Sequence, residues 1–213
     1  VGGVLNIITK DGSQTDGNES ALKLSVGQQN TQQAQFQHQT QSDKLQFGIT
    51  VSHISTDGQN ISIVPNNNEK DGYTNTSIHS KLGYIVNKQH SLNAVFHYVD
   101  YETEFDATDF VITGLPVDAD NRSQGRQQSA KLQWLLTPDA ANWSLNTTAS
   151  THSNVVDNTS DGQLSSLTDA TTQSLSSIAK LDYSNQDMTR QFHVGASLEE
   201  IDFTQRGPVD FGD

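Results

Sequence analysis

The sequence predicts an all-β protein, an antiparallel up-and-down transmembrane β-barrel of which this chain forms a part. Three observations predict this class. Apolar residues alternate with polar ones, short and long connections alternate along the chain, and aromatic residues gather near the short turns. The 213 residues are only 32% hydrophobic and have a mean hydropathy of −0.60, which is low for a packed core of that size. A barrel with a wet, polar interior fits such a composition.

The composition also excludes several classes of protein. The formal net charge of −13 argues against a nucleic-acid partner, which would need clustered Lys and Arg. The chain contains no Cys, so disulfides and thiolate metal sites are absent. It has no apolar run of about 18 residues, so we expect no transmembrane helix. No secretory signal is visible at Val1, and we therefore expect the natural start to lie upstream.

Period-two alternation predicts about nine strands, each with one apolar face. In the fifth of them, Leu92, Ala94 and Phe96 alternate with Asn93 and Val95. The predicted strands lie near 22–26, 34–38, 45–51, 78–86, 92–98, 130–136, 143–149, 175–183 and 192–198. A soluble, adhesin-like β-sandwich would show the same alternation, so alternation alone does not separate a sandwich from a barrel.

The connections between these strands favour the barrel. Short turns are expected near 41–43, 87–90, 137–141 and 185–189, and long loops near 56–72, 105–124 and 154–172. Short turns on one side and long loops on the other are typical of outer-membrane barrels, in which the long loops are extracellular. We expect any ligand to bind at these long loops. Tyr84, Trp134, Trp143 and Phe192 lie on the apolar face near the short turns, where an interfacial girdle would lie.

The apolar face of the fifth strand ends abruptly. Four apolar positions, Leu92 to Tyr98, are followed on the same face by Asp100, Glu102, Glu104 and Asp106. The apolar part spans roughly 20 Å at about 3.3 Å per residue, close to the height of a lipid-facing band. The carboxylates are therefore expected above the membrane.

Three stretches resemble a known family. The first ten residues, "VGGVLNIITK", resemble the segment that closes the plug domain of TonB-dependent outer-membrane receptors. The stretches "DGYTNTSIHSKLGY" (71–84) and "YVDYETEFDA" (98–107) look like the cobalamin-receptor and siderophore-receptor branch. The resemblance implies a last plug strand at 1–10, a link at 11–20, and the N-terminal part of the barrel at 21–213.

The family resemblance implies a barrel of 22 strands around a plug, so about nine strands are only a part of it. It also implies active uptake of a scarce ligand across the outer membrane of a Gram-negative bacterium, with cobalamin as the first expectation and a ferric siderophore as the second. Further expected partners are the TonB energy-transducing complex, through a region upstream of this chain, and lipopolysaccharide. The alternatives are a passive porin-like barrel and the soluble sandwich. No catalytic constellation is visible, and we expect no enzyme.

The acidic segment between Asp100 and Asp120 is the strongest candidate for a metal site. Hard carboxylate oxygens suit Ca²⁺, and the resemblance points to Asp71, Asp100 and Asp106 as calcium ligands. No other cofactor is expected. The alternative is a solvated extracellular rim, or carboxylates that meet lipopolysaccharide through divalent cations. The His residues are scattered singly along the chain, and we expect most of them to be solvated.

Overall fold

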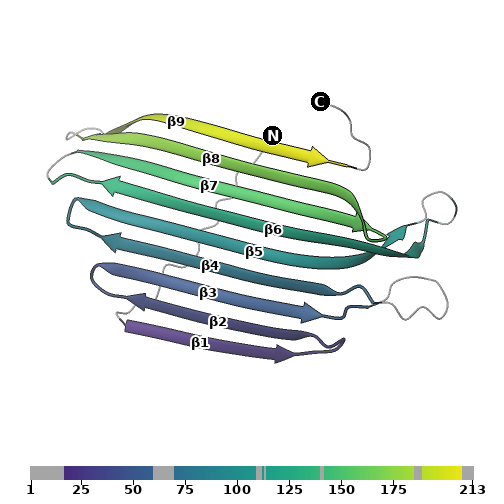
Figure 1. Ribbon diagram of the computed structural model, residues 1–213. Helices are drawn as coiled ribbons and strands as arrows, with labels where there is room; N and C mark the ends of the chain where they lie inside the picture. Colours follow the sequence, from purple (N-terminus) through teal and green to yellow (C-terminus); the bar gives the residue numbers. More distant parts are fainter. Residues whose placement is uncertain are drawn as a thin grey trace.

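The described part of the chain is a single antiparallel sheet of nine strands. The computed structural model describes residues 17–59, 70–108, 112, 114–139, 142–184 and 189–207. Each strand pairs with its neighbour in the sequence, so the order across the sheet is β1 to β9 without a crossover (Figure 1). The predicted plug strand at 1–10 and residues 11–16 of the predicted link lie outside the described residues.

The nine strands are β1 (Gly17–Val26), β2 (Gln32–Gln41), β3 (Leu45–Thr56), β4 (Tyr73–Ile85), β5 (His90–Thr108), β6 (Pro116–Leu136), β7 (Trp143–Ser160), β8 (Gln163–Ser184) and β9 (Thr189–Arg206). The first strand begins at Gly17, so it includes the last four residues of the predicted link. Within the described residues, no helix is long and apolar enough to cross a membrane.

One continuous sheet rules out the sandwich, which would need two sheets packed on each other. The described residues include no buried hydrophobic side chain. Leu132 and Leu175, in the middle of the sheet, are each 53% exposed. The predicted antiparallel, up-and-down all-β fold is therefore confirmed, and its apolar side chains form an uncovered face instead of a core.

Two of the three predicted long loops are wrong. Residues 105–108 and 116–124 are strand, and β7 and β8 fill nearly all of 154–172. The β7–β8 connection is only Asp161 and Gly162, with φ of 51° and 71°. An Asp-Gly pair in the left-handed region is a tight hairpin turn whose twist matches the flanking strands. Polar Ser, Thr and Asn residues had suggested a loop, but they pair as readily as apolar residues once a tight turn sets the register.

The third predicted loop is confirmed as a connection between strands. Residues 57–72 join β3 to β4, and residues 57–59 and 70–72 of it are described. The long strands β5 to β8 extend past the end of β3, on the side of the sheet where this connection lies (Figure 1).

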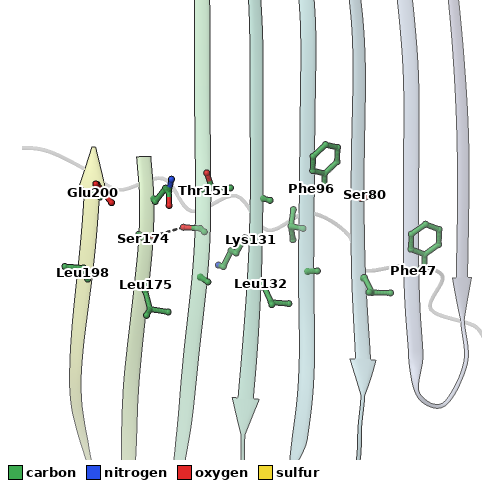
Figure 2. A pocket seen from close by; sticks show the side chains of 17 residues that line it. Phe47, Ser80, Phe96, Lys131, Leu132, Thr151, Ser174, Leu175, Leu198 and Glu200 are labelled. Atoms are coloured by element: carbon green, nitrogen blue, oxygen red, sulfur yellow. Dashed lines mark hydrogen bonds between the residues drawn. The ribbon is translucent and has the colours of Figure 1, made fainter. Parts of the chain in front are cut away.

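The strand register aligns the apolar side chains in a band across the sheet. One row runs through Phe47, Leu82, Ala94, Leu132, Ala149, Leu175 and Leu198. Figure 2 shows Phe47, Leu132, Leu175 and Leu198 on four strands of this face. Toward the short turns, Tyr84 and Trp134 flank Leu92 in one row. The Trp134 ring also stacks on His90 at a centroid distance of 5.7 Å.

The β7–β8 turn and the middle of β3 provide a matched pair of glycine tests. We expect Gly162→Ala to destabilise the full-length protein by about 1 kcal/mol, because Gly162 adopts a positive φ that an L side chain disfavours. We expect Gly48→Ala to be neutral or slightly stabilising, because a Cβ there meets no atom within 4 Å and a flexible residue is removed from the unfolded chain. Denaturant titration in detergent measures both changes. Equal effects would contradict the assigned turn.

Candidate ligand-binding site

A ladder of charged side chains continues the apolar face of β5 and β6 toward the 57–72 connection. The register places Asp100 opposite Arg126, and Glu104 opposite Arg122. Arg126 Nε donates to Asp100 Oδ2 at 3.3 Å, and Arg122 Nη2 donates to Glu104 Oε1 at 2.9 Å. Arg122 Nη1 also lies 3.3 Å from Glu102 Oε1. The predicted acidic row is thus confirmed for Asp100, Glu102 and Glu104, but it is paired with arginines. Asp106 falls at a register shift between Phe105 and Ala107 and does not continue the row.

Arg122 and Arg126 were not predicted as part of the site, because the alternation placed residues 105–124 in a loop and the next strand only at 130–136, whereas β6 begins at Pro116. The signal was present, since two residues four apart in a strand share a face. Their partners could not be assigned without the register, which the sequence does not give. The ladder pairs are between 35% and 59% exposed, so each pair adds little stability, and the ladder mainly fixes the position of its charges.

A polar clasp holds the start and end of the 57–72 connection together. Asp57 Oδ2 accepts a hydrogen bond from Asn30 Nδ2 at 2.7 Å and another from Lys70 Nζ at 3.2 Å. The backbone N–H of Asp57 also donates to the carbonyl of Gln29, in the β1–β2 turn. The hydrogen bonds from Asn30 and Lys70 lower the pKa of Asp57 below its ordinary value. One carboxylate therefore ties the connection to the neighbouring hairpin.

Two glycines bring the backbone of this connection close to its neighbours. A Cβ on Gly58, whose φ is 72°, would lie 1.7 Å from the carbonyl oxygen of Asp71, so only glycine fits there. Gly72 and Glu104 exchange two hydrogen bonds. The Gly72 N–H donates to Glu104 Oε2 at 3.1 Å, and the Glu104 N–H donates to the Gly72 carbonyl at 2.9 Å. The end of the connection at Gly72 is thereby fixed against the charged ladder.

Two polar hollows lie beside the ladder at this end of the sheet. The first, of about 460 Å³, is lined by Asp57, Lys70, Tyr73, Thr74 and Glu104, together with Glu102 and nearby backbone. The second, of about 300 Å³, lies on the far side of Glu102 and is lined partly by Arg126 and Asp157. Volumes of this order suit small-molecule ligands. Hydroxyls, carboxylates and ammonium or guanidinium groups line both hollows, so a polar ligand with several donors and acceptors fits them best.

The three predicted calcium ligands lie in different surroundings. The backbone of Asp71 faces Gly58, and the carboxylate of Asp100 accepts hydrogen bonds from Arg126 and from Tyr98. Asp106 Oδ1 accepts a hydrogen bond from the Ala119 N–H at 3.4 Å, and its Oδ2 is buried without a hydrogen-bond partner in the described structure. Across the described residues, no three His, Asp or Glu side chains form a group that could hold a metal ion.

The architecture is that of part of an up-and-down barrel wall with a charged, hollowed end. Two solved structures share the path of this sheet. FpvA of Pseudomonas aeruginosa, solved with iron-loaded heterologous pyoverdines, matches 91% of the chain with a TM-score of 0.68 and 9% identity. The siderophore receptor PiuA of Acinetobacter baumannii matches 92% with a TM-score of 0.61 and 12% identity. No protein-family model and no curated protein sequence matches the chain.

These matches confirm the predicted fold, because the nine-stranded sheet follows the path of part of the barrel in both solved structures. The chain spans about a third of each solved receptor, 29% of FpvA and 32% of PiuA. Since the identities are low, the likeness concerns the path of the backbone and not the residues of any binding site.

The Asp57 clasp predicts a pH-dependent difference in backbone protection. Folding lowers the pKa of this carboxylate. It therefore holds its hydrogen-bond partners fully at any pH above its unfolded pKa of about 3.9, and releases them as the pH falls through its folded pKa. Asp57→Asn mimics the protonated state. We expect the variant to exchange amide hydrogens faster than wild type around residues 56–59 and 70–72 at pH 7. That difference should shrink as the pH falls through the lowered pKa of Asp57, because the wild-type carboxyl is then protonated as well.

Asp43→Asn, in the β2–β3 turn at the opposite end of the sheet, is the control and should leave these amides unchanged. Hydrogen-exchange mass spectrometry of the full-length protein gives the comparison at each pH. Identical exchange of wild type and Asp57→Asn at pH 7 would show that the clasp does not hold the connection.

Proposed function

We propose that this chain is part of the barrel wall of a TonB-dependent outer-membrane receptor that takes up a ferric siderophore. The observation that carries the proposal is the switch along β5 and β6 from an uncovered apolar band to a charged ladder. The sheet is apolar on one face only, and charged residues follow the apolar ones along the same strands. This is expected of a barrel wall whose strands leave the bilayer at a fixed height. The fold match to two siderophore receptors supports the same assignment.

The proposed ligand is the one that the sequence analysis placed second. Cobalamin was the first expectation, but the comparisons do not support it, and both matched structures are described as proteins that bind siderophores. A ferric siderophore is a polar molecule with many oxygen donors, which suits the hydroxyl and charged lining of the two hollows. In this proposal the hollows form part of the extracellular capture site. Partnership with TonB and contact with lipopolysaccharide follow from the receptor assignment and stand as proposals with it.

Transport by the full-length protein tests the assignment. Expressed in a Gram-negative strain without its own siderophore receptors, it should accumulate one of a panel of ferric siderophores, and an uncoupler of the proton gradient should abolish that uptake. Lys70→Met, in the larger hollow, should weaken ligand binding about tenfold. Lys44→Met, in the β2–β3 turn at the other end, should leave it unchanged. Uptake that continues with the uncoupler would identify a passive porin-like barrel, and uptake of cobalamin alone would restore the first expectation.

Calcium binding at the charged end is a separate proposal. The buried Oδ2 of Asp106, which has no hydrogen-bond partner among the described residues, is the feature that favours it, because a carboxylate oxygen with an unused lone pair suits a hard cation. The arginines paired with Asp100 and Glu104 oppose it. Calorimetric titration of the full-length receptor should show calcium binding that Asp106→Ala removes and Asp139→Ala, beside the β6–β7 turn, retains. No heat in the wild type, or no loss in Asp106→Ala, would refute calcium.

A further inference from the structure

Two histidines that are far apart in the sequence face each other across neighbouring strands. His79 in β4 lies directly opposite His97 in β5, on the polar face of the sheet. Their ring centroids are 5.8 Å apart, and the ring planes meet at 64°. Both side chains are half-buried. The strands β4 and β5 are adjacent over their shared length (Figure 1), so the pair is set by the sheet register and not by a loop.

The spacing of the two rings is close to that of two imidazoles bound to one metal ion. Imidazole nitrogens bind zinc at about 2.0–2.1 Å, which puts the centroids of two rings on one tetrahedral ion about 5 Å apart. The observed 5.8 Å is slightly longer, so the two side chains must turn toward a shared ion while the backbone keeps its place. Imidazole is a good ligand for Zn²⁺, Cu²⁺ and Ni²⁺, and a poor one for Ca²⁺ or Mg²⁺.

The neighbouring hydroxyls can support a bound ion. Thr50 of β3 lies opposite His79, and Ser129 of β6 lies opposite His97, so the two hydroxyls flank the histidine pair in the same row. A hydroxyl in such a position can accept the second ring N–H of a metal-bound His. His79 also borders a hollow of about 140 Å³ over which Gly48 and Gly83 place no side chain. This hollow lies on the β3 side of His79 and does not reach His97.

Charged and titratable neighbours on this face set limits on the affinity. Lys81 lies two residues after His79 in β4, and Lys131 lies two residues after Ser129 in β6. Residues two apart in a strand share a face, so both lysines are on the polar face with the histidines. On β3, the residues nearest the pair are Thr50 and Gly48, which carry no charge. Nearby positive charge opposes a bound cation. With no third His, Asp or Glu grouped with the pair among the described residues, the site keeps open positions.

We propose that His79 and His97 form a two-imidazole binding site for a divalent transition ion of the Cu²⁺ and Zn²⁺ class, with water in the remaining positions. The site is formed by side chains of the polar face alone. The proposal holds or fails independently of whether the protein transports a siderophore.

Copper titration of the full-length protein in detergent at pH 7.5 tests the site, with electron paramagnetic resonance as the readout. We expect one Cu²⁺ to bind with the nitrogen hyperfine signature of two imidazoles. His79→Gln and His97→Gln should each weaken this site at least tenfold, and neither single variant nor the double variant should show the signature of two imidazoles. Lowering the pH to 5.5 should release the ion, since imidazoles must be neutral to bind it.

His152→Gln is the matched control. His152 lies in the same row of the polar face, but Ser129 of β6 separates it from His97, which puts it two strand spacings or about 10 Å away. Its replacement should leave the copper site intact. The proposal is overturned if copper binding is unchanged in either His79→Gln or His97→Gln, or if the signature shows a single imidazole. It is also overturned if His152→Gln removes the site.

Discussion

The hydrogen-bonded ladder between successive strands is the constraint on which the other features of this protein depend. Nine strands pair in chain order, and each pairing fixes which side chains share a face and which share a row. Because side chains alternate in a strand, one register decides every row at once. The apolar band, the charged ladder beyond it and the histidine pair on the other face all follow from that single alignment.

In the described structure, the strand pairing leaves the apolar band without any covering. A monomeric soluble protein rarely exposes so wide an apolar face, and a lone sheet normally buries one face against another layer. Here the described residues contain no buried hydrophobic side chain. A bilayer on the apolar face and water on the polar face would meet the needs of both. This is the physical basis for assigning the sheet to a barrel wall.

The sequence predicted the fold class, the number of strands and the apolar face, because period-two alternation reports directly on a sheet with two unlike faces. It located the switch from Tyr98 to Asp100 correctly for the same reason. It failed where the alternation becomes polar on both faces, as in β7 and β8, and read those strands as a loop although the Asp161–Gly162 turn was visible. The pairing of Arg122 with Glu104, and of His79 with His97, depends on register, which no single strand encodes.

The barrel assignment depends on one face of β5, which is proposed to meet lipid from Leu92 to Tyr98 and water from Asp100 to Glu104. This chain contains no Cys, so single cysteines can be placed along β5 and spin-labelled in the full-length protein in bilayers. Accessibility to oxygen and to a water-soluble paramagnetic reagent then reports the surroundings of each label. We predict oxygen-dominated accessibility at residues 92, 94, 96 and 98, and water-reagent-dominated accessibility at 100, 102 and 104. High accessibility to the water-soluble reagent along the whole series would contradict the barrel assignment.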